Sequence, residues 1–192
     1  MRILMLGNSY TRANNLPEQL GRTLDAQVVA HTRGGARLAE QLNPNTKMGA
    51  RTQAALAQGG WDFVILQEMS NGPATAPERY RESVAALCIQ VRRTGAIPIL
   101  FATWAYAPGA ARLDKLEMDA EELHRRLHAS FVRTADETGA LLADVGSAFH
   151  DDTDPDRLYA PDGSHPSPAG TALACRILAA TVRQAAGLLP SA

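Results

Sequence analysis

Five short apolar runs, each followed by a segment with helical spacing, constrain the fold of this chain more than any other feature. The runs have the length of β-strands and cover residues 3–6, 27–30, 63–66, 97–102 and 141–145. Between them, apolar residues recur on one helix face, as at Tyr80, Val84, Leu87, Cys88 and Val91. Strands that alternate with helices favour a parallel sheet with helices on both faces. The pattern therefore predicts an α/β fold, a three-layer α/β/α domain around a five-stranded parallel sheet.

Composition and charge narrow the class of protein. The chain has 192 residues, of which 45% are hydrophobic and 20% charged, so one domain spanning 1–192 is expected. The net charge is −1, with no massed basic residues, which argues against nucleic acid as a partner. Cys88 and Cys175 stand in apolar helical segments and are expected to be buried free thiols.

The start of the chain predicts a cytoplasmic location. No basic segment and long apolar stretch precede the first strand, and no apolar run approaches the roughly 18 residues that suggest a membrane span. No membrane association is expected. Removal of a signal peptide would leave a similar start, so secretion stays open as the alternative.

Ser9, Asp162 and His165 are the residue types of a nucleophilic hydrolase. Ser9 follows the first apolar run within Gly-Asn-Ser-Tyr-Thr, which places it at a strand-to-helix corner. Chemistry in open parallel sheets usually occurs at the carboxyl ends of the strands. Asp162-Gly163-Ser164-His165 precedes the last helical segment, so this loop is expected to return over the same edge. A serine hydroxyl needs a base, and the base needs a third group that fixes its tautomer.

Other readings of these residues are open at this stage. A serine at such a corner is a favoured helix N-cap, and Asp-Gly is a common turn. Asp144, at the end of the fifth strand, is a rival for the acid. His124 and His128 have the i, i+4 spacing of a metal-binding pair, but no third ligand is apparent, so no metal site is expected.

The two ends of the chain resemble the SGNH or GDSL-type hydrolases, and the carbohydrate-esterase-like branch in particular. Gly7-Asn8-Ser9-Tyr10 is similar to the first block of that family, with Asn8 where Asp is usual. Gly34-Gly35 is similar to the second block, and Asp162-Gly163-Ser164-His165 matches the last in full. The third block lacks the usual Gly-x-Asn-Asp. With the strand pattern, the resemblance implies a flavodoxin-like strand order, 2-1-3-4-5.

The oxyanion hole has several candidate donors. The backbone N–H of Ser9 is one, and Gly35 is the second, with Gly34 nearly equivalent, because glycine lets the backbone approach a ligand closely. The side-chain donor is either Gln67, at the end of the third strand, or Asn71, four residues later. Gln67 is preferred slightly, because a strand fixes its position better than a loop.

These residues predict a serine esterase that forms an acyl-enzyme on Ser9 and uses no cofactor. The expected partner is a small-molecule ester, with a short acyl group such as acetyl on a carbohydrate or another polar alcohol. Trp104 and Glu68 are the candidate substrate-binding residues; a core position of the Trp104 indole and a contact of Glu68 with a neighbouring helix are the open alternatives. Two alternatives stay open: a flavodoxin-like module that binds phosphate or flavin through the loop after the first strand, and a degenerate hydrolase that binds without turnover.

Overall fold

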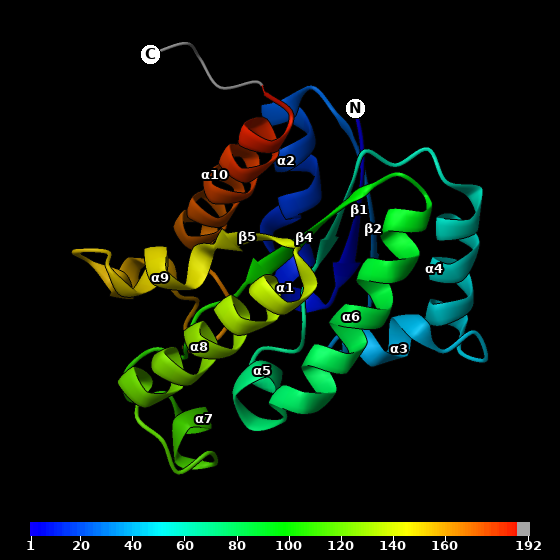
Figure 1. The fold of residues 1–192 in the computed structure, drawn as a ribbon. Coiled ribbons are helices and arrows are strands. Elements are labelled where there is room, and N and C mark those ends of the chain that lie inside the picture. Colours follow the sequence, from blue (N-terminus) through cyan, green and yellow to red (C-terminus); the bar gives the residue numbers. More distant parts are fainter. Residues whose placement is uncertain (188–192) are drawn as a thin grey trace.

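The computed structural model describes residues 1–187, in which five parallel strands form one twisted sheet (Figure 1). The strands are β1 (Arg2–Gly7), β2 (Gln27–Thr32), β3 (Phe63–Leu66), β4 (Ile97–Ala102) and β5 (Leu141–Asp144). Their order is β2-β1-β3-β4-β5, which confirms the predicted order 2-1-3-4-5. Because all pairs are parallel, every strand ends at the same edge of the sheet.

Helices cover both faces of the sheet, as the strand and helix periodicity predicts. The longer helices are α2 (Leu16–Leu24), α4 (Lys47–Gln58), α6 (Pro77–Arg93), α8 (Ala120–Thr138) and α10 (Pro168–Ala185). The shorter ones are α1 (Ser9–Arg12), α3 (Leu38–Leu42), α5 (Gly72–Thr75), α7 (Ala111–Asp114), α9 (Val145–His150) and the 3₁₀ turns η1 (Ala13–Asn15) and η2 (Pro155–Leu158). The α/β/α layering is confirmed in this part of the chain.

The core consists of two apolar clusters separated by the sheet. Successive strand residues point to opposite faces, so in β1 Leu4 and Leu6 join one cluster while Ile3 and Met5 join the other. The first cluster packs under α4, α6 and α8, and the second under α2, α9 and α10. Strands buried on both faces explain why these runs are continuously apolar rather than alternating.

Helix α10 begins where the Asp162–His165 loop ends. Ser167 is its N-cap, and its Oγ accepts a hydrogen bond of 3.1 Å from the Gly170 N–H. Pro168 occupies the first turn, where its missing N–H costs nothing. These two residues fix where the helix begins and thereby where the preceding loop lies over the sheet edge.

A further sequence expectation, about the two cysteines, is met within residues 1–187. Cys88 and Cys175 are both buried and free. Among the described helices, none is both long enough and apolar enough to cross a bilayer.

Candidate active site

Ser9 is the first residue of α1, directly beyond the carboxyl end of β1. Asn8 caps this helix, since its side-chain Oδ1 accepts a 3.0 Å hydrogen bond from the Tyr10 N–H. The cap is therefore Asn8, and the Ser9 hydroxyl is left available. The first N–H groups of a helix have no intrahelical acceptor, so the Ser9 N–H is available as a donor as well.

Ser9, His165 and Asp162 form a continuous hydrogen-bonded chain. Ser9 Oγ lies 2.9 Å from His165 Nε2, and His165 Nδ1 lies 2.6 Å from Asp162 Oδ2. The predicted return of the last loop over the sheet edge thus joins residues that are 156 positions apart. A carboxylate at Nδ1 holds the proton on that nitrogen and leaves Nε2 as the acceptor facing the hydroxyl.

Asp162 is ionised and held by its own loop. Its Oδ1 accepts hydrogen bonds from the Ser164 N–H at 3.0 Å and the His165 N–H at 2.9 Å. Partial burial raises the pKa of Asp162, but the hydrogen bonds from the His165 ring and these two N–H groups outweigh it and lower the pKa to about 2. The Asp162 carboxylate is therefore charged at neutral pH.

Trp104 and Tyr10 support the histidine loop from beneath. The Trp104 Nε1–H donates to the Ser164 carbonyl at 3.0 Å, and Tyr10 Oη lies 2.7 Å from Ser164 Oγ. The Tyr10 and Trp104 rings stack with centroids 4.9 Å apart. Trp104 is only 1% exposed, so the prediction that it lines a substrate pocket is wrong: its indole is core that positions the loop.

Gln67 and Glu68 hold the nucleophile loop in place. Gln67 Oε1 accepts hydrogen bonds from the Asn8 N–H and from Thr11 Oγ1, both at 2.9 Å, while Nε2 donates to the Glu68 carbonyl. The Gln67 side chain is fully buried. Its amide is therefore engaged within the protein, and the geometry favours a positioning role over the predicted contact with an oxyanion.

Glu68 is buried too, which corrects its assignment as a substrate-binding residue. Its Oε2 accepts from the Leu38 N–H at 3.1 Å and its Oε1 from the Met69 N–H at 2.8 Å. Burial raises the pKa of Glu68, although these two N–H groups oppose that shift. With an exposure of 3%, the carboxyl ties α3 to the loop after β3 instead of reaching a ligand.

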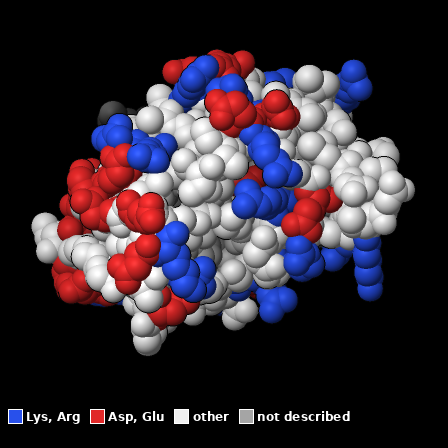
Figure 2. All heavy atoms as spheres, turned by 90° about the horizontal axis from the view of Figure 1, so that it is seen from below, with Lys and Arg blue, Asp and Glu red and all other residues white. Residues whose placement is uncertain are grey.

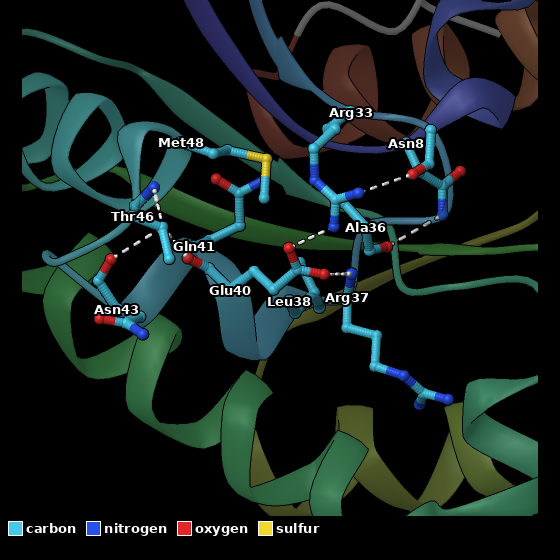
Figure 3. Close-up of polar contacts among 12 residues, drawn as sticks. Asn8, Arg33, Ala36, Arg37, Leu38, Glu40, Gln41, Asn43, Thr46 and Met48 are labelled. Carbon is cyan, nitrogen blue, oxygen red and sulfur yellow. Dashed lines mark hydrogen bonds and ion pairs between the residues drawn. The ribbon is translucent and has the colours of Figure 1, made fainter.

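Gly34 and Gly35 form a turn beside Asn8. The Ala36 N–H donates to the Arg33 carbonyl at 3.0 Å, and Gly35 has φ of 67°, a conformation that favours glycine. The Asn8 amide donates to the Ala36 carbonyl at 3.2 Å, which fixes the turn to the nucleophile loop (Figure 3). An Asp at position 8 would lack this donor, so Asn suits this version of the site.

The open space at the site is small and polar. A cavity of about 270 Å³ is lined by Asn8, Ser9, Arg12, Ala13, Thr32, Arg33, Gly34 and His165. Gly35 and Asn71 are not among these lining residues. Asn71 is half-buried at the N-cap position of α5, and its Oδ1 has no hydrogen-bond partner within residues 1–187. Its role as an oxyanion donor stays a prediction.

Sequence reasoning missed Arg12 and Arg33. Both arginines line the cavity, but along the sequence they are two of many Arg residues that show no clustering. Position would have identified them: Arg12 lies three residues after Ser9, on the same face of a helix, and Arg33 directly precedes the glycine pair. Tyr10 and Ser164 were missed as supports because their contact joins the two ends of the chain.

Asp144, the alternative acid, takes part in a separate set of contacts at the start of α9. Its Oδ1 caps α9 by accepting a 3.0 Å hydrogen bond from the Ser147 N–H. Its Oδ2 lies 3.3 Å from His128 Nδ1, and the His124 ring stacks on His150 instead of facing the cavity. The triad geometry therefore involves Asp162 rather than Asp144.

Replacing Gly7 with Ala tests the packing beneath the nucleophile. A Cβ at this position would lie 2.3 Å from Thr11 Oγ1 and 2.6 Å from Gln67 Oε1, two fully buried groups that hydrogen-bond each other. We expect G7A to lower the free energy of unfolding by about 1–3 kcal/mol. Because Asn8 and Ser9 follow directly, ester hydrolysis should fall as well. Urea denaturation followed by Trp fluorescence measures the stability change.

Gly34→Ala is the matched stability control for G7A. A Cβ there meets no heavy atom within 4 Å, and the residue has no positive φ. Its urea midpoint should therefore stay near that of the parent protein. Equal midpoints for G7A and the parent would show that the contacts of Thr11 and Gln67 are not tight.

Comparisons with known proteins identify the family and the fold. A family model described as the GDSL-like lipase/acylhydrolase family matches residues 5–173. A Slackia heliotrinireducens protein described as an SGNH hydrolase is 53% identical, with a TM-score of 0.92, over 95% of this chain and 98% of that one. No curated protein sequence matches significantly.

More distant structures share the fold. A lipase/acylhydrolase from Enterococcus faecalis is 16% identical, with a TM-score of 0.69, over 96% of this chain and 97% of that one. A variant of an acetyl-xylooligosaccharide esterase from Geobacillus is 18% identical, with a TM-score of 0.65, over 94% and 93%. The matched family model spans most of the chain, from β1 into α10, and the chain belongs to the GDSL-like (SGNH) hydrolase family.

Proposed function

We propose that this protein hydrolyses carboxylic esters through a triad of Ser9, His165 and Asp162. The observation that carries the proposal is the unbroken chain of contacts, 2.9 Å from Ser9 Oγ to His165 Nε2 and 2.6 Å from His165 Nδ1 to Asp162 Oδ2. Ser9 and His165 both line the 270 Å³ cavity, which supports access of an ester to the hydroxyl.

The contacts suit a two-step acyl transfer. Ser9 Oγ attacks the ester carbonyl while His165 Nε2 takes the hydroxyl proton, and the Asp162 carboxylate stabilises the imidazolium that forms. Collapse of the tetrahedral intermediate breaks the bond to the alcohol, which receives that proton from His165. Water then attacks the acyl-enzyme with His165 again as the base, and the acid leaves. No cofactor takes part in these steps.

Negative charge on the former carbonyl oxygen needs donors near Ser9. The Ser9 N–H and an N–H of the Gly34–Gly35 turn are the proposed backbone donors, and Asn71 is the proposed side-chain donor. Gln67 is instead proposed to hold the Asn8 N–H and Thr11 in place, because its amide is buried and engaged. Loss of one true donor typically lowers kcat by about 100- to 1,000-fold, so variants at Gln67 and Asn71 would separate these roles.

A short acyl group on a polar alcohol is the proposed substrate class. Among the cavity residues, Ala13 has the largest apolar side chain, and most others are polar, so a long alkyl chain would find little surface to bury. An acetyl-xylooligosaccharide esterase also shares the fold, at 18% identity.

An acyl-chain series tests the substrate class. We expect kcat/KM to fall steeply from 4-nitrophenyl acetate to butyrate to octanoate, because the cavity offers longer chains little apolar contact. Acetate release from acetylated xylo-oligosaccharides, measured in parallel, tests the polar alcohol. Faster turnover of octanoate than of acetate would contradict the short-acyl proposal while leaving the triad intact.

A further inference from the structure

Besides the triad histidine, two ionisable side chains line the candidate active-site cavity, and both are cationic arginines. Arg12 and Arg33 share this cavity of about 270 Å³ with Ser9 and His165, and within residues 1–187 no carboxylate is among its lining residues. In a space this small, a group bound by either guanidinium lies within a few bonds of the reacting ester. Ester hydrolysis itself does not require these two charges, so they are candidates for substrate selection.

Arg33 is held in a fixed orientation. Its guanidinium forms an ion pair with Glu40 of α3 and donates to the Gly34 carbonyl at 3.1 Å (Figure 3). Glu40 also accepts a 3.1 Å hydrogen bond from the Arg37 N–H, so the carboxylate is itself anchored. A guanidinium has five N–H donors, so these contacts leave some of them free for another acceptor. Glu40 offsets part of the charge, and Arg33 therefore contributes mainly directed donors.

Arg12 carries an uncompensated charge. It lies in the last turn of α1, three residues after Ser9, and its side chain is exposed. Within residues 1–187, no acidic side chain lies within 4 Å of its guanidinium, whereas Arg33 has Glu40. On the face where the strands end, acidic side chains are densest toward one side, while Lys and Arg side chains are spread across the face, some of them near its middle (Figure 2). A free arginine beside a nucleophile is well suited to an anionic ligand.

We propose that this site prefers esters that carry a carboxylate close to the scissile bond, bound by Arg12 with Arg33 as the second donor. The inference rests on the proposed esterase function and deepens it. A guanidinium fork matches the two oxygens of a carboxylate, and charge-assisted hydrogen bonds are about twice as strong as neutral ones. The carboxylate belongs either to the alcohol, as in a uronic acid, or to the acyl group, as in the half-ester of a dicarboxylic acid.

Two matched pairs of esters test the preference and distinguish the two sources. The alcohol arm compares an acetylated methyl glucuronide with the corresponding acetylated methyl glucoside, and the acyl arm compares monomethyl succinate with methyl butyrate. In at least one arm, we expect kcat/KM to be about tenfold or more higher for the anionic member. Added salt should reduce this ratio, because the bound charge is close to solvent.

Variants assign the preference to its residues. Arg12→Gln should remove the preference, because kcat/KM should fall about tenfold or more further for the anionic member than for the neutral member of each pair. Arg37→Gln is the matched control, because it removes the same charge nearby from a residue that does not line the cavity and whose side chain points away from Arg33 (Figure 3). It should retain the preference.

The outcomes separate the two proposals. Hydrolysis of all four esters without a charge preference, or an equal loss for both members in Arg12→Gln, would overturn the carboxylate inference and leave the esterase proposal standing. Failure of the parent protein to hydrolyse any of the four esters, or 4-nitrophenyl acetate, would overturn both. A preference retained in Arg12→Gln but lost in Arg37→Gln would also contradict the assignment.

Discussion

Replacing Ser9 with Ala, or His165 with Ala, is expected to lower kcat for 4-nitrophenyl acetate by about 10⁴- to 10⁶-fold. Each change removes one end of the 2.9 Å contact through which the hydroxyl loses its proton. Because the members of a triad act as a unit, the double variant should be little worse than either single one. Steady-state rates, with a pre-steady-state measurement of the acyl-enzyme burst, check both points.

Ser130→Ala and His150→Ala are the controls for these two variants. Ser130 is on α8 and His150 ends α9, and neither lines the cavity. Both should retain the parent rate. Activity that survives Ser9→Ala would mean that another group attacks the ester or that the site binds without this chemistry. That result would return the flavodoxin-like binding module and the degenerate hydrolase to consideration.

Replacing Asp162 with Asn should lower kcat by roughly 10⁴-fold without loss of the fold. An amide can donate to His165 Nδ1, which places the ring proton on Nε2 and leaves no acceptor for the Ser9 hydroxyl. Asp144→Asn is the matched control, since Asp144 also lies beside a histidine, 3.3 Å from His128 Nδ1, but outside the cavity. A larger effect at Asp144 than at Asp162 would reverse the assignment of the acid.

Asp162→Asn should also change how the free energy of unfolding depends on pH. The pKa of Asp162 is lowered to about 2 in the folded protein from an ordinary value of 3.8. A depressed pKa contributes stability above pH 3.8, and that contribution is lost as the pH falls toward 2. Asp162→Asn should therefore reduce the difference in unfolding free energy between pH 5 and pH 2.5. Urea titrations at the two pH values measure it. An unchanged difference would show that the carboxylate is not held as described.

Much of the fold could be predicted because strands buried on both faces have a recognisable sequence pattern, a short and continuously apolar run. The run before Gly7 and the one that ends at Leu66 are continuously apolar, since both of their faces are covered. Helix α6 (Pro77–Arg93) likewise has the predicted apolar face, since Tyr80, Val84, Leu87, Cys88 and Val91 are all buried. Strand order depended on the family resemblance as well, because periodicity alone does not state which strands are neighbours.

The polar network beneath the site could not be predicted, because its members are far apart along the chain. Gln67 at the end of β3 was expected to face a ligand, yet its side-chain Oε1 accepts a 2.9 Å hydrogen bond from the Asn8 N–H, 59 positions away. Trp104 was expected in a pocket wall, yet it donates to the Ser164 carbonyl from within the core. Whether an amide or an indole after a strand faces solvent or core depends on which loops cross that edge.

The sequence by itself determined the layered α/β architecture and identified Ser9, Asp162 and His165 as the candidate hydrolase residues. Apolar periodicity and short motifs are local features of the sequence, so they can be recognised without knowledge of the tertiary contacts. Only the tertiary structure decided which polar side chains face the cavity: Arg12 and Arg33 line it, while Gln67 and Glu68 are buried. Exposure at an active site is a property of several loops packed together, and that packing is set by contacts between distant parts of the chain.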